Sequence, residues 1–196
     1  MISSLIWVFT ADISILVRKI LGGLYMLFGW KIVGDKPQER KYVIVVAPHT
    51  SNWDFFVGWG ARNVIGFYPN FFVKDSLFRL PFIGCFLKFI GGIPVDRSRS
   101  TNMVDQAVEW YQKKEDLIMT IAPEGTRSYA PEWKTGFYRI ADKAKVPVVK
   151  IGFDYGTKTV FIDKPYYTKG NMKEEVEEIK SYFKKFKGKH PENGVK

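Results

Sequence analysis

The pattern of apolar and polar positions predicts short strands separated by helices. Three mainly apolar runs, rich in β-branched side chains, have the character of strands buried in a parallel sheet: residues 42–47, 117–122 and 146–153. Three shorter strands are expected at residues 71–73, 93–95 and 159–162. Helical spacing of apolar side chains predicts helices at residues 52–64, 101–114, 136–145 and 172–187, with a broken helix at residues 77–90. This alternation is typical of a layered α/β domain, and its polar tail at residues 188–196 is expected to fray.

The N-terminal segment is unusually apolar, because its first thirty residues carry charges only at Asp12, Arg18 and Lys19. Its uncharged stretches are shorter than the roughly 20 residues that a helix needs to cross a bilayer. No basic residue precedes its apolar run, as one would in a secretory signal peptide. We therefore expect helices that lie in the membrane interface, where four aromatic side chains suit the depth of the headgroups: Trp7, Tyr25, Phe28 and Trp30. The alternative is that these helices cover the protein's own core.

Composition narrows the classes of site and partner. The chain has 196 residues, which fits a membrane-associating segment at residues 1–40 followed by one domain at residues 41–196. A single cysteine, Cys85, rules out internal disulfides and cysteine-rich zinc sites, and the two histidines, His49 and His190, rule out sites that need several. The net charge of +10 favours anionic partners, such as anionic membranes or phosphorylated substrates. Nucleic acid is not an expected partner, because no recognition-helix, RNA-binding or zinc signature accompanies the charge.

A histidine and an aspartate, His49 and Asp54, follow the first buried strand. On one continuous helix they would point about 140° apart, since an α-helix has 3.6 residues per turn. They meet only if His49 lies in a turn and Asp54 lies in the first turn of the next helix. The residues between them, Thr50, Ser51 and Asn52, suit such a turn. A carboxylate on one ring nitrogen would leave the other nitrogen to act as a general base. Taken alone, the pair also fits a surface histidine beside a capping aspartate.

Two further polar clusters follow predicted strands. One comes after the second buried strand and consists of Glu124, Gly125, Thr126 and Arg127. Its arginine and backbone N–H groups suit a phosphate or a carboxylate. If the strands are parallel, this cluster and the histidine lie at the carboxyl edge of the sheet, where α/β sheets bind ligands. The other cluster ends at Arg97. Taken alone, the first cluster fits a tight turn with a surface ion pair better than a binding site, and Asp96 and Arg97 fit a loop salt bridge as well as a binding site.

Together, these segments give the chain a strong resemblance to the glycerolipid acyltransferase family, whose best-known members are 1-acylglycerol-3-phosphate acyltransferases. The resemblance spans residues 43–149. It rests on four motifs in order: H-x-x-x-x-D at 49–54, F-V-K-D-S through G-G-I-P-V-D-R at 72–97, P-E-G-T-R-S at 123–128 and V-P-V-V at 146–149. The fold that it implies resembles glycerol-3-phosphate acyltransferase. That fold is an α/β domain with a mostly parallel mixed sheet flanked by helices, here preceded by the N-terminal interfacial helices.

The resemblance implies a role for each matched residue. His49 is the general base and Asp54 orients it, and the acyl group passes from a thioester to an acceptor hydroxyl without an acyl-enzyme. Ser51 then shapes the turn rather than attacking, and Cys85 is expected in the core. No metal ion or cofactor is implied besides the donor, which is acyl-CoA or acyl carrier protein. The acceptor's phosphate and glycerol are held by a larger set: Glu124, Gly125, Thr126, Arg127, Arg97 and Lys74.

The acceptor that the resemblance implies is 1-acylglycerol-3-phosphate, and the product is phosphatidic acid. The chain departs from many members at Pro48, Ala122 and Lys150, and it is shorter than many. An arginine pair holds a carboxylate as well as a phosphate, so lyso-ornithine and lyso-glycine lipids are competing acceptors. An apolar groove for the acyl chain, with Gly58 and Gly60 thinning one wall, is expected among six aromatic residues: Phe55, Phe56, Trp59, Phe82, Phe86 and Phe89.

The resemblance and the apolar N-terminal segment together imply a location and partners. The lack of a targeting peptide and the compact length add the expectation of a bacterial enzyme on the cytoplasmic face of the inner membrane, in contact with membrane lipids. The sequence does not give the oligomeric state. The alternative class is a catalytically silent membrane-binding protein with the same fold. That alternative is disfavoured because the residues that the chemistry needs are all present: His49, Asp54, Glu124 and Arg127.

Overall fold

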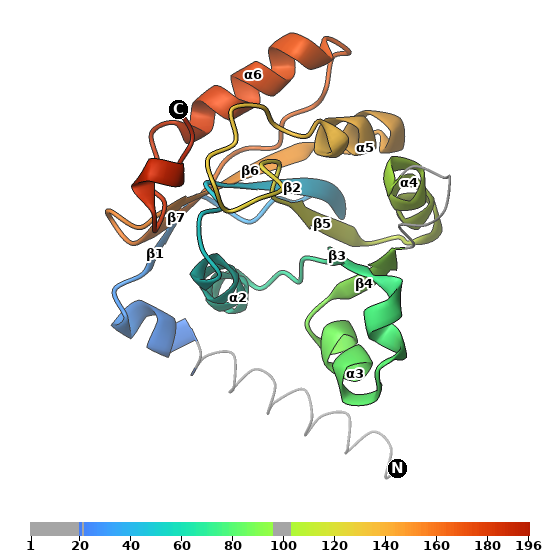
Figure 1. Ribbon diagram of the computed structural model, residues 1–196, viewed down its shortest axis with the longest axis horizontal. Helices are drawn as coiled ribbons and strands as arrows, with labels where there is room; N and C mark the ends of the chain where they lie inside the picture. Colours follow the sequence, from blue (N-terminus) through green and yellow to red (C-terminus); the bar gives the residue numbers. More distant parts are fainter. Residues whose placement is uncertain (1–19, 21, 96–102) are drawn as a thin grey trace.

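The computed structural model describes residues 20, 22–95 and 103–196, and its centre is a five-stranded sheet (Figure 1). In their order across the sheet, the strands are β1 (Lys31–Val33), β7 (Thr159–Ile162), β6 (Val148–Asp154), β2 (Lys41–Ala47) and β5 (Leu117–Ile121). Neighbouring strands are parallel except for β6 and β7, which are antiparallel. The prediction of a mostly parallel mixed sheet is therefore confirmed.

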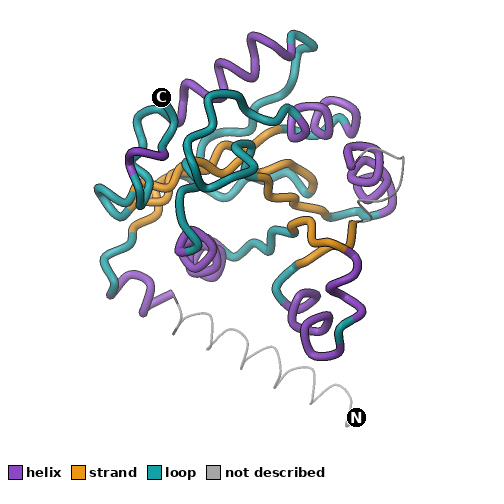
Figure 2. The backbone as a smooth tube through the Cα atoms, in the orientation of Figure 1, coloured by secondary structure: helices purple, strands orange, loops and turns teal. Residues whose placement is uncertain are grey.

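Strand β2 lies inside the sheet and is buried on both faces, which explains its unbroken apolar sequence. Val43 and Val45 point into a core on one side of the sheet, and Tyr42 and Ile44 point into a second core on the other side. Helices cover both faces, as Figure 2 shows. The first core is covered by α4 (Met103–Lys113), α5 (Gly136–Ala144) and α6 (Met172–Phe183), and the second by α2 (Trp53–Ile65).

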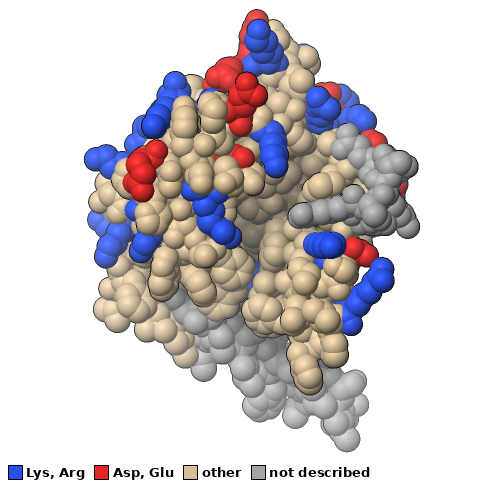
Figure 3. Space-filling view, viewed as in Figure 1, with Lys and Arg blue, Asp and Glu red and all other residues tan. Residues whose placement is uncertain are grey.

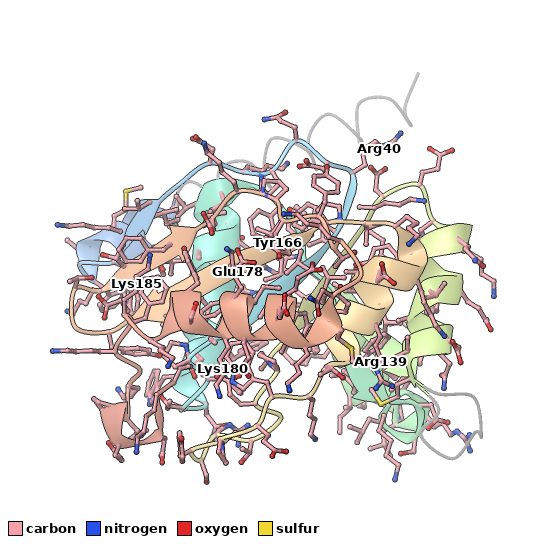
Figure 4. All side chains as sticks on the ribbon, turned by 90° about the horizontal axis from the view of Figure 1, so that it is seen from above. Arg40, Arg139, Tyr166, Glu178, Lys180 and Lys185 are labelled. Carbon is pink, nitrogen blue, oxygen red and sulfur yellow. The ribbon has the colours of Figure 1, made fainter. Side chains whose placement is uncertain are left out.

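Helix α6 packs along the outside of the first core. Its inner side chains, spaced at three and four residues, are Val176, Ile179 and Phe183. On its outer side, Glu178 accepts a hydrogen bond from the Tyr166 hydroxyl at 2.8 Å (Figure 4).

The C-terminal tail is held against the rest of the protein, so the expectation that it frays is wrong. Helix α6 ends at Phe183, and Phe186 is buried in the same core. Further along the tail, the backbone N–H of His190 donates to the Thr50 hydroxyl at 3.2 Å. The tail therefore packs on the turn that follows β2.

A smaller two-stranded sheet stands beside the main one. Its parallel strands are β3 (Phe71–Lys74) and β4 (Gly92–Val95), and the chain between them forms a 3-10 helix, η1 (Asp75–Arg79), and helix α3 (Pro81–Phe89). The predicted broken helix at 77–90 is confirmed, because Leu80 is extended and proline disfavours a helical conformation in the residue before it. Asn70 connects the two sheets, since its backbone N–H donates to the Ile118 carbonyl at 2.7 Å.

The beginning of the described chain contributes to the core and to the sheet. Trp7, Arg18 and Lys19 lie outside the described residues, and residues 22–27 are helical. Tyr25 is buried against α2, where a Cβ added at Gly60 would collide with its ring. The expectation that Tyr25 lies at a membrane interface is therefore wrong. The edge strand β1, which the sequence pattern did not indicate, follows and pairs with β7.

The apolar side chains near the N-terminus divide between two environments. Trp30 is partly buried and stacks on Tyr25, whereas Leu27 and Phe28 are 80% and 70% exposed. Within the described residues, no helix combines the length and the apolar character that crossing a bilayer requires.

Helix α3 turns most of its apolar side chains outward, so the prediction that Cys85 lies in the core is wrong. Cys85 is exposed, and Gly84 is the helix's one buried residue. The helix packs through Gly84, where an added Cβ would collide with the Phe78 carbonyl. Its other side is left bare by the described part of the chain, with Phe82 90% and Phe89 77% exposed.

Candidate active site

The turn between β2 and α2 brings His49 and Asp54 together. Strand β2 ends at Ala47, a cis peptide bond joins Ala47 to Pro48, and α2 begins at Trp53. His49 lies in the turn and Asp54 in the first turn of the helix, which is the arrangement that their spacing predicts. His49 Nδ1 is 3.0 Å from Asp54 Oδ2. The His49 side chain is 26% exposed and that of Asp54 is 2% exposed, so the ring reaches solvent while its partner is sealed off.

Asp54 receives hydrogen bonds on both carboxylate oxygens. Besides the His49 ring, Oδ2 accepts the backbone N–H groups of Thr50 and Ser51, each at 2.9 Å. Oδ1 accepts the Tyr155 hydroxyl at 2.7 Å. Burial raises the pKa of this carboxyl, but the hydrogen bonds from the ring, the hydroxyl and the backbone outweigh burial and leave it below its ordinary value. The ionised Asp54 fixes the tautomer of His49 that carries its proton on Nδ1, and it stabilises the imidazolium that forms when Nε2 takes a proton.

Replacing Asp54 with asparagine should lower the free energy of unfolding at pH 7 by about 1–3 kcal/mol, because a neutral amide satisfies the same buried donors less well than a carboxylate. The folded protein lowers the pKa of Asp54, so the stabilisation is present above the reference value of 3.8 and is lost as the pH falls below it. Urea unfolding between pH 7 and pH 3 measures the free energy of unfolding of both proteins. The difference between wild type and Asp54→Asn should become smaller as the pH falls.

The control for this experiment is Asp105→Asn, because Asp105 forms an exposed ion pair with Lys143 on the surface. This variant should change the free energy of unfolding by less than about 1 kcal/mol throughout the pH range. If the difference in the free energy of unfolding between wild type and Asp54→Asn stayed constant in acid, the ionised state assigned to Asp54 would be wrong.

Ser51 shapes the same turn, as the resemblance implies. Its hydroxyl accepts the backbone N–H of Trp53 at 3.2 Å, and the residue is 7% exposed. This hydrogen bond satisfies one of the free donors at the start of α2, which is the usual task of a serine before a helix.

The glutamate of the second motif lies beneath the histidine turn. Strands β2 and β5 are parallel, with Val45 opposite Ile121, so the segments that follow them leave the same edge of the sheet. Glu124 Oε1 accepts the backbone N–H of His49 at 2.9 Å. Glu124 is buried, and burial raises its pKa, an effect that the His49 N–H only partly offsets. No ion pair joins Glu124 to Arg127 in the part of the chain that the structure describes, so this carboxyl supports the His49 turn.

A cavity of about 770 Å³ is lined in part by His49 and Asp54. His49, Gly125, Thr126 and Arg127 supply polar lining, and apolar side chains of α2 and the sheet supply much of the rest. These apolar residues include Phe55, Trp59, Ile44, Ile151, Phe153 and Val160. In the space-filling view the molecule is hollowed near its centre, and Lys and Arg side chains stand around the hollow (Figure 3).

The cavity takes in only part of the aromatic set expected to form an acyl groove. Phe55 and Trp59 line it, whereas the remaining four are exposed and lie outside its lining: Phe56, Phe82, Phe86 and Phe89. Gly58 lines the cavity, and a Cβ added there would approach the Phe153 ring to 3.3 Å. Gly60 packs on Tyr25 instead, so its absent side chain makes room for the N-terminal segment and not for a ligand.

The other predicted anion-binding residues lie in different places. Arg127 lines the cavity, whereas Lys74 ends β3 with an exposed side chain and is not among the lining residues. Arg97 lies outside the described residues. In the described part of the chain, no group of three or more histidine, cysteine, aspartate or glutamate side chains is arranged to hold a metal ion.

Two residues of the site were not anticipated from the sequence. Tyr155 follows β6, which is parallel to β2, so the carboxyl-edge rule could have indicated it. Arg62 is a buried cation in the cavity wall, where its Nη1 donates to the Ile90 carbonyl at 3.1 Å and its guanidinium lies 5.5 Å from the Trp59 ring. Nothing in the helical pattern of α2 distinguishes this arginine from an exposed one.

The chain is similar to known proteins along most of its length. It is 30% identical over 188 residues to the 1-acyl-sn-glycerol-3-phosphate acyltransferase of Saccharomyces cerevisiae, covering 83% of this chain and 58% of that protein. It is 25% identical over 191 residues to the enzyme of the same name from Haemophilus influenzae, covering 85% and 77%. The chain thus spans little more than half the length of the yeast relative.

The fold also matches a solved structure, the 1-acyl-sn-glycerophosphate (LPA) acyltransferase PlsC from Thermotoga maritima. The TM-score is 0.56 at 20% sequence identity, over 84% of this chain and 76% of that one, which supports the likeness of the folds alone. The family model described as Acyltransferase matches residues 30–154, which include the His49 turn, the Glu124 motif and Tyr155's neighbour Asp154. Since this match covers more than half of the chain, the chain belongs to the acyltransferase family.

Proposed function

We propose that this protein is an O-acyltransferase that moves a fatty acyl group from a thioester to the free hydroxyl of 1-acylglycerol-3-phosphate, giving phosphatidic acid. The observation that carries the proposal is the pairing of His49 with the buried Asp54, beside a largely apolar cavity that Arg127 also lines. The names of the yeast and Haemophilus relatives support this acceptor.

In the proposed reaction, His49 Nε2 takes the proton of the acceptor hydroxyl while the hydroxyl oxygen attacks the carbonyl carbon of the thioester. The carbon–sulfur bond of the resulting tetrahedral intermediate then breaks, and the thiolate leaves with the proton that His49 carries. Asp54 remains ionised and balances the imidazolium between the two steps. Acyl transfer is direct, and the Ser51 hydroxyl is engaged in the turn rather than acting as a nucleophile.

The acceptor's phosphate is assigned to Arg127 and the Gly125 backbone, which line the cavity. Lys74 lies outside this lining and Arg97 outside the described residues, so their part in binding the acceptor stays a prediction. Gly125 has a φ of 63°, which glycine adopts without strain. The donor is acyl-CoA or acyl carrier protein, and no metal ion or further cofactor takes part. The second candidate acceptor is a lyso-ornithine or lyso-glycine lipid, because the Arg127 guanidinium that lines the cavity binds a carboxylate as well as a phosphate.

The proposed location is the cytoplasmic face of a bacterial inner membrane, where the acceptor resides. Five large apolar side chains are exposed at the surface: Leu27, Phe28, Phe82, Phe86 and Phe89. Their exposure to water is unfavourable, and exposed apolar surface of this kind supports contact with lipid. The net charge of +10 suits an anionic leaflet, and membrane lipids are therefore proposed partners.

The test is thiol release by detergent-solubilised protein from palmitoyl-CoA and from palmitoyl carrier protein. Lysophosphatidic acid and a lyso-ornithine lipid are offered in parallel. We expect release at least about tenfold faster with lysophosphatidic acid, since its phosphate dianion carries more negative charge than a carboxylate for Arg127 to bind. The rate should fall at acid pH, because a general base acts only in its unprotonated form, and a chelator should leave the rate unchanged. Thiol release with the lyso-ornithine lipid but not with lysophosphatidic acid would support acyl transfer and show that the proposed acceptor is wrong. No release with any donor and acceptor would refute the proposed function.

A further inference from the structure

Tyr155 lies just beyond the end of β6, 101 residues from the aspartate that its hydroxyl contacts. We propose that Tyr155 is a positioning residue for the catalytic pair, and that its hydroxyl holds the Asp54 carboxylate in the rotation that presents Oδ2 to His49. This inference rests on the proposed acyl transfer for its kinetic test, and it has a structural test that does not.

The two oxygens of Asp54 have separate tasks. Oδ2 serves the His49 ring and two backbone N–H groups of the turn. Among the described residues, the Tyr155 hydroxyl is the one hydrogen-bond donor to Oδ1, at 2.7 Å. A carboxylate that is bonded through one oxygen can rotate about that contact, whereas one that is bonded through both cannot. The tyrosine therefore fixes the angle at which the carboxylate meets the imidazole.

Tyr155 is itself held from several sides. The Trp30 ring meets it edge to face, with 5.1 Å between centroids, and the Tyr155 backbone N–H donates to the Lys187 carbonyl at 2.8 Å. The preceding residue, Asp154, accepts the backbone N–H of Lys187 at 3.1 Å and the Thr157 hydroxyl at 2.7 Å, which closes the turn around the tyrosine. The segment that carries the phenol is therefore tied to the N-terminal segment and to the C-terminal tail.

The charges around the phenol keep it a donor. Burial and the neighbouring Asp54 carboxylate raise the pKa of Tyr155 well above its ordinary value, so the hydroxyl stays protonated. The Lys189 ammonium lies 5.9 Å from the ring centroid, and Tyr25 is a further titratable neighbour. In return, the hydroxyl spreads the negative charge of Asp54 and is one of the causes that lower the pKa of that carboxyl.

The kinetic experiment compares Tyr155→Phe with the full-length wild-type protein. The variant should lower kcat by about 10- to 100-fold, as the loss of a hydrogen bond behind a reacting group commonly does, and it should leave KM for donor and acceptor within about twofold. The acid limb of the pH–rate profile should move to higher pH, because an Asp54 carboxylate without this hydrogen bond holds the imidazolium proton more tightly. A loss of kcat without a displaced limb would overturn the proposal, because it would show that the Tyr155 hydroxyl does not act through the Asp54–His49 pair.

The matched control is Tyr166→Phe. It removes another tyrosine hydroxyl that donates to a carboxylate, that of Glu178 at 2.8 Å, on the outer side of α6 (Figure 4). This variant should keep kcat, KM and the acid limb of the wild type. A second variant, Trp30→Leu, keeps the Tyr155 hydroxyl but removes the ring packed against it. It should lower kcat and displace the acid limb in the same directions as Tyr155→Phe, but by less. An unchanged rate in both Tyr155→Phe and Trp30→Leu would overturn the proposal.

The structural experiment needs no substrate. The chain has two histidines, so NMR signals of the His49 ring are identified by their loss in His49→Ala, and the His190 signals serve as internal reference. In Tyr155→Phe the Nδ1 proton signal of His49 should be displaced, while the His190 signals and the thermal unfolding midpoint should stay close to the wild type. An unchanged Nδ1 signal would overturn the proposal. Because this signal is independent of lipid substrates, it decides about Tyr155 even if the acyl-transfer proposal fails.

Discussion

His49→Ala should lower the rate of acyl transfer by about 10²- to 10⁴-fold, the range commonly contributed by a positioned general base. In the proposed reaction the imidazole takes the proton from the acceptor hydroxyl, and neither of the described carboxylates beside it is placed to replace it. Asp54 is buried behind the ring and already holds four donors. Glu124 accepts a hydrogen bond from the backbone N–H of His49. Thiol release from palmitoyl-CoA in the presence of lysophosphatidic acid measures the loss.

The matched control is the other histidine of the chain. His190 has a half-exposed side chain 3.7 Å from Glu192, and its link to the catalytic turn runs through its backbone N–H, which His190→Ala retains. This variant should keep the wild-type rate within about twofold, as expected of a surface substitution. If His49→Ala, folded as judged by its thermal unfolding, retained more than a tenth of the wild-type rate, the assignment of His49 as the base would be wrong.

Gly58→Leu should lower kcat/KM for a palmitoyl donor by about 10- to 100-fold, a range that corresponds to the cost of inserting a side chain into filled or nearly filled space. The glycine faces the cavity wall, and a Cβ there would already approach the Phe153 ring to 3.3 Å. We propose that the apolar part of the cavity holds the acyl chain, and the remaining carbons of a leucine would enter that space. An octanoyl donor needs less of this space, so its kcat/KM should fall less.

The control for the glycine is Gly136→Leu at the start of α5, where nothing lies within 4 Å of an added Cβ. It should leave the ratio of palmitoyl to octanoyl kcat/KM unchanged. Gly58→Ala should produce a smaller loss than Gly58→Leu, because only the Cβ contact is added. Equal losses with both donors in Gly58→Leu would show that the cavity does not hold the acyl chain, and would leave the role of His49 intact.

Local sequence signals accounted for most of the elements. Strand β2 could be predicted because a segment buried on both faces is apolar at successive positions. Its residues Tyr42, Val43, Ile44 and Val45 are all nearly inaccessible to solvent. The break before α3 was legible because Pro81 constrains the residue before it. Strand β1 was not legible, since three residues at a sheet edge carry no periodicity of their own and are defined by pairing with β7.

The predictions of burial were wrong for residues whose packing partners lie far away in the chain or whose helix face could not be foreseen. Tyr25 has the composition of a membrane-interface residue, yet it is buried because Gly60 on α2 leaves room for its ring. Cys85 lies in an apolar run, yet it is exposed because the buried residue of α3 is its neighbour Gly84. Apolar character predicts that a side chain leaves water, but not which surface it meets.

The sequence by itself determined the pairing of His49 with Asp54, because the two residues are five positions apart and a strand, a turn and a helix start bring such neighbours together through local geometry. It also determined the mostly parallel sheet, through the apolar runs that such strands need. Only the tertiary structure decided what surrounds the pair. Tyr155 reaches Asp54 across 101 residues, and Glu124 reaches the His49 backbone across 75, because parallel strands β6, β2 and β5 end at one edge of the sheet. Contacts of this kind follow from strand order, which no local pattern encodes.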